Sequence, residues 1–301
     1  QDGLEHQSMT TLTFSDGFLY FGTVCVSWTD SNYGYGVYRC VDASDGTVLW
    51  THANPGKGYY WSGAVVFGGT VIFAGDDGIL TSLNKTTGAV LDTLALGAPV
   101  RATAVLDGNH ALLTSKDGRL HKITLQNDGT FGGGSSVLFA AESTSTPAVA
   151  DGKAYVGGSA ADYSGVLAVI DLASMQVTHI AQTAAPVQSS PLVSVGYGAQ
   201  RYVYFTANAA PGGVYVLNAS AAVPAVQTLF TPEEADRNYC LASVISGGDG
   251  TLYYTNDSGK LFAVGVKMLE SESCWQRVFR WLQAAWDWVL HYLLFGWAWR
   301  K

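Results

Sequence analysis

The chain has 301 residues, of which 48% are hydrophobic, 12% aromatic and only 13% charged, with 35 glycines and a net charge of −8. The glycine content excludes a helical bundle or coiled coil, because each glycine inside a helix costs about 1 kcal/mol relative to alanine. The apolar content excludes a disordered chain, and the acidic charge disfavours nucleic-acid binding, since phosphate contacts need clustered Lys and Arg.

A short glycine-containing turn between two apolar runs recurs along the chain. It appears as FSDGFLYFG (14–22), VFGGTVIFAG (66–75), VLDGNHALLT (105–114), VADGKAYVG (149–157), the degenerate RYVYFT (201–206) and GDGTLYYT (248–255). Asp-Gly or Gly-Gly between alternating apolar residues is typical of a β-hairpin. The sequence therefore predicts a repeated hairpin unit with a period of roughly 40 to 50 residues.

Further apolar runs follow each hairpin. A third strand is predicted at 37–42, 80–84, 120–124, 166–171, 214–218 and 261–264, and a fourth at 47–50, 89–92 and 176–180. Short antiparallel strands at this period are typical of propeller blades. We predict an all-β propeller over residues 1–268, with six four-stranded antiparallel blades. Residues 1–7 are expected to supply the outermost strand of the last blade and close the ring, and residues 132–134 (GGG) are expected to form a loop.

One segment matches a known motif. Residues 40–50, CVDASDGTVLW, resemble the tryptophan-docking motif of pyrroloquinoline-quinone-type β-propellers, and residues 82–92 and 169–179 are eroded copies of it. In this motif a turn Asp bonds its own backbone, Gly supplies a positive φ and Trp fills the space between blades. The resemblance, to proteins of the bacterial surface or secreted type, implies a mode of blade packing and no particular reaction.

The resemblance also raises the question of a cofactor. Quinoproteins of this type are usually eight-bladed, stack the quinone between a Trp and a disulfide of adjacent cysteines, and hold calcium through carboxylates and amides. In this sequence no two cysteines are adjacent and six repeats are visible. We therefore expect no cofactor and no metal. Non-enzymatic relatives, such as the outer-membrane assembly lipoprotein, share the repeat without the quinone.

Cysteine spacing gives limited information. The four cysteines, Cys25, Cys40, Cys240 and Cys274, show no zinc-ligand spacing. Cys25 and Cys40 lie in successive apolar runs, so either a cross-strand disulfide joins them or both are small buried hydrophobic residues. The chain begins without Met or a signal peptide, which predicts either a removed signal or a piece of a longer protein.

The expected binding site is the mouth of the central channel, where the innermost strands begin. The corresponding segments are 7–8, 60–62, 101–102, 144–145, 188–189 and 239–240. Within them we select Tyr60, Trp61, Arg101, Gln188 and Tyr239 as ligand-binding residues, because aromatic rings stack on sugars or side chains and arginine pairs with carboxylates. The alternative is that they line a water-filled channel and satisfy one another's hydrogen-bonding groups.

A different pattern begins after residue 268. Residues 269–301 hold six of the nine tryptophans, and residues 274–301 carry a net charge of +3, which leaves −11 for the rest. Polar residues recur every three or four positions, which predicts an amphipathic α-helix. Its apolar face contains Trp275, Phe279, Leu282, Trp286, Val289 and Leu293.

Three alternatives remain open for this tail. It lies in a membrane interface or binds a partner, it packs on the propeller, or it spans a membrane. A span is disfavoured because Gln283, Asp287 and His291 would be costly in hydrocarbon.

No nucleophile elbow, zinc-binding helix or phosphate-binding loop occurs, so we expect no catalytic residue. The sequence predicts a non-catalytic extracytoplasmic scaffold, at the cell surface, secreted or periplasmic. It is expected to bind a protein, peptide or glycan at the channel mouth and a membrane or partner through its tail. The alternatives are an enzyme or small-ligand binder of the same superfamily and, less favoured, a quinoprotein dehydrogenase remnant.

Overall fold

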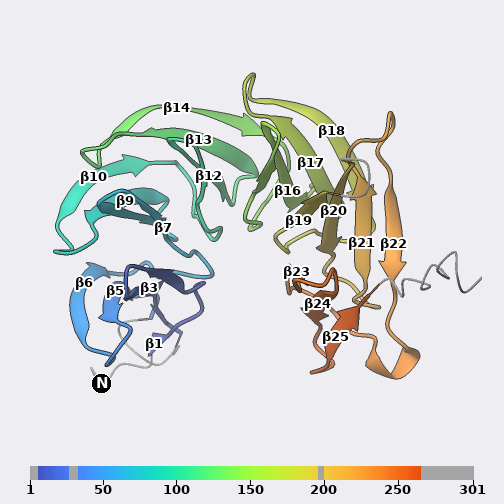
Figure 1. Ribbon diagram of the computed structural model, residues 1–301, viewed down its shortest axis with the longest axis horizontal. Coiled ribbons are helices and arrows are strands. Elements are labelled where there is room, and N and C mark those ends of the chain that lie inside the picture. Colours follow the sequence, from blue (N-terminus) through green and yellow to red (C-terminus); the bar gives the residue numbers. More distant parts are fainter. Residues whose placement is uncertain (1–5, 27–32, 196–199, 266–301) are drawn as a thin grey trace, which may run out of the picture.

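The computed structural model describes residues 6–26, 33–195 and 200–265 (Figure 1). In these ranges the regular structure is β, apart from the 3₁₀ turn η2 (Glu234–Asp236). Six antiparallel sheets follow one another around a common axis in chain order, each beginning with its innermost strand. The prediction of an all-β propeller is confirmed.

The six sheets are numbered here as blades 1 to 6. Blade 1 contains β2 (Thr13–Ser15), β3 (Phe18–Gly22), β5 (Gly36–Asp42) and β6 (Val48–Asn54). Blade 2 contains β7 (Val65–Phe67), β8 (Thr70–Ala74), β9 (Ile79–Asn84) and β10 (Val90–Ala95). Blade 3 contains β11 (Val105–Asp107), β12 (His110–Ser115), β13 (Arg119–Leu125) and β14 (Phe131–Leu138).

Blade 4 contains β15 (Ala148–Ala150), β16 (Lys153–Ser159), β17 (Gly165–Asp171) and β18 (Gln176–Thr183). Blade 5 contains β19 (Leu192–Val195), β20 (Arg201–Thr206), β21 (Val214–Asn218) and β22 (Val226–Phe230). Blade 6 contains only β23 (Ile245–Ser246), β24 (Leu252–Thr255) and β25 (Leu261–Val264). Four strands per blade is therefore right for blades 1 to 5, and blade 6 has three strands among the described residues.

The inner hairpins follow from their turn residues. Asp16 and Gly17 have φ values of 52° and 85°, and Asp151 and Gly152 have 51° and 70°. A two-residue turn with both φ values positive matches the right-handed twist of the strands that it joins. The Asp-Gly pairs thus fix the register of β2 with β3 and of β15 with β16.

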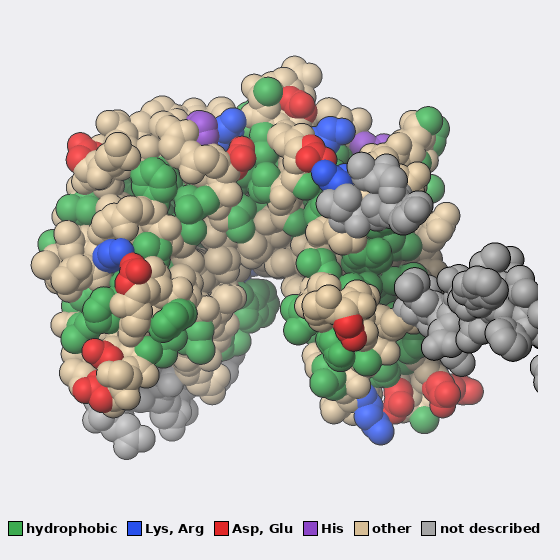
Figure 2. Space-filling model, viewed as in Figure 1, with side chains coloured by type: hydrophobic (Ala, Val, Ile, Leu, Met, Phe, Trp, Pro, Cys, Tyr) green, Lys and Arg blue, Asp and Glu red, His purple; other side chains and the backbone are tan. Residues whose placement is uncertain are grey.

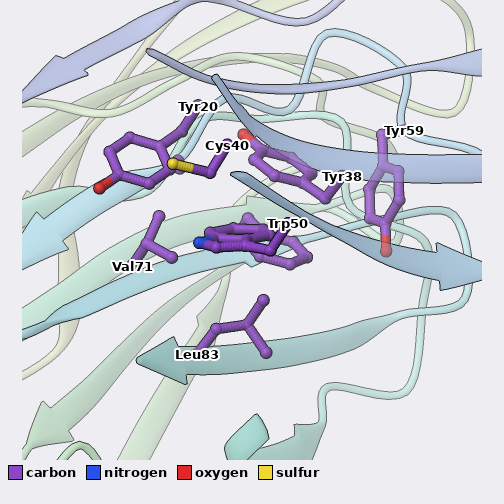
Figure 3. Packing of buried hydrophobic residues seen from close by; sticks show 9 residues of the cluster. Tyr20, Tyr38, Cys40, Trp50, Tyr59, Val71 and Leu83 are labelled. Atoms are coloured by element: carbon purple, nitrogen blue, oxygen red, sulfur yellow. The ribbon is translucent and has the colours of Figure 1, made fainter. Parts of the chain in front are cut away.

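The core lies between the blades. Five hydrophobic clusters each join one blade to the next. In the first cluster Tyr38 of blade 1 stacks on Phe73 of blade 2, with ring centroids 3.8 Å apart. Tyr59 meets Tyr38 edge-on (Figure 3). Because each strand alternates its side chains between two faces, every internal blade packs against both of its neighbours.

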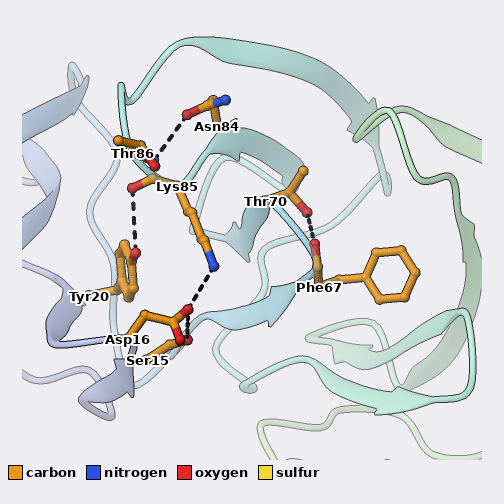
Figure 4. A network of polar contacts seen from close by, with 8 residues as sticks. All are labelled: Ser15, Asp16, Tyr20, Phe67, Thr70, Asn84, Lys85 and Thr86. Carbon is orange, nitrogen blue, oxygen red and sulfur yellow. Dashed lines mark hydrogen bonds and ion pairs between the residues drawn. The ribbon is translucent and has the colours of Figure 1, made fainter.

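Polar contacts at the surface join the same blades. Lys85 of blade 2 forms a 2.7 Å ion pair with Asp16 of blade 1 (Figure 4). The Lys85 ammonium group and the Ser15 hydroxyl hold the pKa of Asp16 below its ordinary value. The Asp16 carboxylate is largely exposed, so this pair defines orientation more than it stabilises the fold.

The ring does not close as predicted. Residues 6–7 form β1 (His6–Gln7), which pairs with β4 (Val24–Cys25) beside blade 1 and not with blade 6. Among the described residues, blades 1 and 6 are separated by a gap in the arc (Figure 2). The expectation that the N-terminal residues complete the last blade is therefore wrong for residues 6 and 7.

Two further expectations are resolved by the strand pairing. Cys25 and Cys40 are both free and buried, because the partners of Cys40 across β3 and β6 are Tyr20 and Trp50. Residues 132–134 belong to β14 and not to a loop. Pairing with β13 overrides the weak strand propensity of glycine.

The tail predicted as a helix over 269–301 lies outside the described residues, as does the end of the predicted propeller domain at 266–268. In the part of the chain that the structure describes, no helix has the length and apolar character of a membrane span.

Candidate functional site

A cavity of about 300 Å³ opens on the axis of the arc. Residues from all six blades line it, and these are Thr11, Trp61, Arg101, Thr144, Thr146, Gln188, Ser190, Leu241, Ala242 and Ser243. Most lie in the segments that lead into the innermost strands. Its size is at the lower end for small-ligand sites, so it accommodates a few side chains or a sugar ring.

One position recurs in every blade. Two residues before each innermost strand lie Thr11, Gly63, Thr103, Thr146, Ser190 and Ser243. The backbone N–H at this position donates to the side-chain hydroxyl of the same position in the next blade. The four bonds start at Gly63, Thr103, Thr146 and Ser190, with lengths of 3.0, 3.0, 3.1 and 2.8 Å. We call this row the axial relay.

The axial relay fixes the blades relative to one another at the cavity wall. Each bond satisfies a backbone donor, and each spans 40 to 53 residues of sequence. Further hydroxyls support it, since Thr114 donates to the Ser145 carbonyl and Ser145 to the Ser189 carbonyl, at 2.7 and 2.8 Å. Apart from Trp61, Arg101, Leu241 and Ala242, the described cavity wall therefore consists of neutral hydroxyl and amide side chains held by the fold.

Trp61 differs from the other lining residues in its backbone. Its φ is +56°, a left-handed conformation that bulky residues rarely adopt. Its side chain is 37% exposed. Strain of this kind persists only where the surrounding structure fixes it and is enriched at binding sites, so Trp61 is the leading candidate for direct ligand contact.

Arg101 is engaged by neighbouring side chains. Its Nε and Nη2 donate to the two carboxylate oxygens of Asp76, at 3.0 and 2.7 Å. Its guanidinium carbon lies 4.4 Å from the Tyr60 ring centroid and 5.7 Å from that of Trp61. These hydrogen bonds raise the pKa of Arg101, and Asp76 compensates its charge. Asp76 therefore takes the place of the ligand carboxylate that was expected to pair with Arg101. The guanidinium also packs against the rings of Tyr60 and Trp61.

The structure brings three of the five selected residues to the cavity wall, namely Trp61, Arg101 and Gln188. Tyr60 lies behind the wall against Arg101. Tyr239 does not line the cavity, although its side chain is 56% exposed, and blade 6 contributes residues 241–243 instead.

The hydroxyl residues of the axial relay are absent from the residues selected from the sequence, and these are Thr11, Thr103, Thr146, Ser190 and Ser243. Their sequence signal is a hydroxyl residue two positions before five of the six innermost strands, which becomes visible only once the strands are aligned. The six tail residues predicted to contact a membrane or partner lie outside the described residues.

A quinone or metal does not fit these residues. Among the described residues that line the cavity, Arg101 is the only charged one and none is a carboxylate. No group of three or more His, Cys, Asp or Glu residues within the described ranges is placed to hold a metal ion. The described cysteines are buried singly, so the disulfide on which a quinone would stack has no counterpart among them.

A second polar cluster lies in blade 3. The Ser115 hydroxyl is 2.7 Å from Nε2 of His121 and also donates to Asp117. This resembles a nucleophile beside a base, but Ser115 has no exposed surface. A substrate cannot reach it, so the cluster acts in closing the turn between β12 and β13.

Comparison with known proteins agrees with this architecture. Residues 35–276 match the model of the family described as outer membrane protein assembly factor BamB. No curated protein matches the chain.

Two solved structures illustrate the fold. The crystal structure of BamB from Moraxella catarrhalis has a TM-score of 0.56 and 17% identity, over 86% of this chain and 77% of that chain. A chain in the crystal structure of a mitotic checkpoint complex has a TM-score of 0.63 and 13% identity, over 85% of this chain and 75% of that chain. At these identities the likeness shows the fold alone.

Proposed function

The chain belongs to the family of the outer membrane protein assembly factor BamB, and on this premise we propose that it is a non-catalytic scaffold that binds a partner protein at its axial cavity. The family description, an assembly factor at an outer membrane, supports contact with other proteins. It also supports a location outside the cytoplasm, at the cell surface, in the periplasm or secreted.

The observation that carries the proposal is Trp61. An exposed aromatic side chain on a strained backbone, at the edge of a cavity walled by every blade, has the character of an anchor. Tryptophan is enriched among the residues that dominate binding energies. The partner segment is expected to be uncharged, because Asp76 already compensates Arg101 and the remaining wall is hydroxyl, amide and apolar.

The composition of the wall also supports a non-catalytic role. General acid–base chemistry needs a group that gains or loses a proton near neutral pH. The described residues of the cavity lining include no Asp, Glu, His, Cys or Lys, and the guanidinium of Arg101 stays protonated. Binding without reaction is therefore the activity for which these residues are suited.

A neutral glycan is the second candidate, and one arrangement favours it. Gln188 accepts a 2.7 Å hydrogen bond from Asn208 through its carbonyl oxygen, which leaves its amide N–H groups to donate. An amide and several hydroxyls beside an exposed indole ring suit a sugar, because the ring stacks on the pyranose face and the polar groups bind its hydroxyls.

Peptide and glycan arrays probed with the full chain test both candidates. Trp61→Ala is expected to weaken binding of any ligand found by about tenfold or more, as loss of an anchor does. Tyr163→Ala is the matched control, because Tyr163 is also aromatic, exposed and at positive φ but does not line the cavity. Equal loss in both variants, or no ligand on either array, would contradict the proposed site.

For the tail, the sequence alone favours contact with a membrane surface or a partner over packing on the propeller. The tail lies outside the described residues, and liposome flotation of the full chain beside a chain that ends at residue 268 tests it. Equal flotation of the two would exclude a membrane role for the tail.

A further inference from the structure

One side of blade 6 is exposed, whereas the equivalent side of blades 2 to 5 is covered by the next blade. The first residue of each innermost strand in blades 2 to 5 packs into the cluster shared with the next blade, as Val65, Val105, Ala148 and Leu192 show. The equivalent residue of blade 6 is Ile245, which is 62% exposed. This side of a blade is called its forward face.

Strand alternation defines the rest of that face. Tyr254 and Phe262 point back into the cluster shared with blade 5, so their strand neighbours point forward. Ile245 pairs with Tyr253, and Tyr253 pairs with Ala263, which places these side chains in one row across three strands. Leu261, 69% exposed, lies beside them. The forward face of blade 6 is therefore an apolar sheet surface.

Two hydrogen-bonding positions beside this face also lack described partners. The axial relay ends at Ser243, whose backbone N–H donates to no described residue, whereas the four relay residues from Gly63 to Ser190 donate to the next blade. In addition, the outer edge of β25 has no fourth strand among the described residues. Free strand edges and exposed apolar sheet faces are normally covered in stable proteins.

We propose that the chain's own residues 266–301 cover the forward face of blade 6. This segment starts directly after Gly265, at the rim of the face. Its 36 residues approach the 40 to 53 residues that separate relay positions in successive blades. The segment is thus long enough, and attached at the right place, to occupy the position that a following blade takes elsewhere.

Composition and charge favour the same occupant. Six tryptophans in the segment supply an apolar surface for Ile245, Tyr253 and Leu261. Residues 266–301 carry five cationic side chains against three carboxylates, a net charge of +2. Residues 231–265 carry five carboxylates against two cationic side chains, a net charge of −3. Of the alternatives open from the sequence, packing on the propeller therefore accounts for both the tail and the exposed face.

Limited trypsin digestion of the full chain tests the contact, because Arg277 and Arg280 lie within the segment. Ile245→Ser and Leu261→Ser are expected to raise the cleavage rate at these sites by about tenfold, since cleavage follows the population of the undocked segment. Val223→Ser is the control, because Val223 is 80% exposed in the loop between β21 and β22. The cleavage rate of this control variant should equal that of the unsubstituted chain.

Each other outcome overturns the proposal. Rapid cleavage in the unsubstituted chain, unchanged in both variants, means that the segment does not dock. Protection that rises with protein concentration identifies a second copy as the occupant, and protection that appears only with lipid vesicles identifies a membrane.

The two substituted positions lie on different strands. If one substitution opens blade 6, which faster cleavage at Lys260 would reveal, the other variant still tests whether the segment docks. Acrylamide quenching of the unsubstituted chain is independent of any substitution. Docking predicts weak quenching of the tail tryptophans, and quenching as strong as that of free tryptophan overturns the proposal.

Discussion

The indole Nε1 of Trp50 donates a 3.0 Å hydrogen bond to the backbone carbonyl of Lys85, which joins the outermost strand of blade 1 to a turn of blade 2. The ring also occupies the space beside Gly88, where a Cβ would lie 2.6 Å from Trp50 Cγ. Gly88 has a φ of +71°, so the turn needs glycine for both conformation and space. This contact is the docking interaction that the motif at residues 40–50 predicts.

Two substitutions of Trp50 should distinguish the stability that its packing contributes from the stability that its hydrogen bond contributes. Trp50→Ala is expected to cost about 3–5 kcal/mol of unfolding free energy through loss of buried ring contacts. Trp50→Phe should cost less, about 1–2 kcal/mol, because the Tyr20 hydroxyl still donates to the Lys85 carbonyl. Urea unfolding measures both, with Leu49→Ala at an exposed neighbouring position as the control. Equal costs for Phe and Ala would show that the packing contributes little.

The axial relay should be sensitive to loss of one hydroxyl. Thr146→Val keeps the side-chain shape and leaves the Thr103 N–H without its acceptor, an expected cost of about 1–3 kcal/mol. Thr144→Val, in the same segment and also on the cavity wall, removes no relay bond and should leave stability nearly unchanged. Thermal unfolding distinguishes the two, and equal losses would mean that the relay bond contributes nothing specific.

Gly63 is the one relay position without a side chain, and the reason is space. A Cβ at this position would lie 2.8 Å from Thr103 Oγ1 and 3.0 Å from Thr11 Cβ. Gly63→Ala is therefore expected to destabilise the fold by about 1–3 kcal/mol through overpacking. Gly69→Ala, where a Cβ meets nothing within 4 Å, is the matched control. A neutral Gly63→Ala in denaturant titration would show that the blades separate easily at the axis.

Substitutions of Arg101 and Asp76 should have coupled effects on stability. Asp76→Ala leaves a half-buried guanidinium without its bidentate acceptor, at an expected cost of about 1.5–3 kcal/mol. Changing Arg101 to Met in addition should recover part of that loss, because no uncompensated charge then remains. A double-mutant cycle by thermal unfolding measures the coupling. Strictly additive effects would indicate that the two side chains act independently.

Acid should destabilise the protein partly through His121. Burial lowers the pKa of His121 below its ordinary value of 6.5, so the folded state keeps the ring neutral while the unfolded state takes a proton as pH falls through 6.5. The stability is thus present above that pH and is lost as pH decreases below it. His121→Asn should flatten the decrease in melting temperature between about pH 7.5 and 5. An identical decrease in melting temperature in the variant would mean that another group causes it, for example His52, whose pKa burial also lowers.

The blades could be predicted because they rest on local patterns. The Asp16–Gly17 and Asp151–Gly152 turns and the alternating strands beside them determine hairpins within a few residues of sequence. The cavity could be predicted in part for the same reason, since Trp61, Arg101 and Gln188 lie just before innermost strands.

The remaining features depend on pairings that no local pattern encodes. Asp76 has the sequence character of a solvated turn carboxylate, yet it pairs with Arg101, which lies 25 residues away. The two-residue strand β1 carries no alternation from which its partner β4 could be recognised. Residues 132–134 are strand because β13 supplies hydrogen bonds, whatever their own propensity.

Among the described residues, the gap between blades 1 and 6 makes the blades a linear array instead of a closed ring. In the part of the chain that the structure describes, each interior blade packs against two neighbours, whereas blades 1 and 6 each share a hydrophobic cluster with only one. In such an array stability is a sum of nearest-neighbour interfaces, and unfolding starts at the ends. Amide protons of blades 3 and 4 should therefore exchange most slowly. Because a docked tail would give blade 6 a second interface, blade 1 would be the first part of the propeller to open.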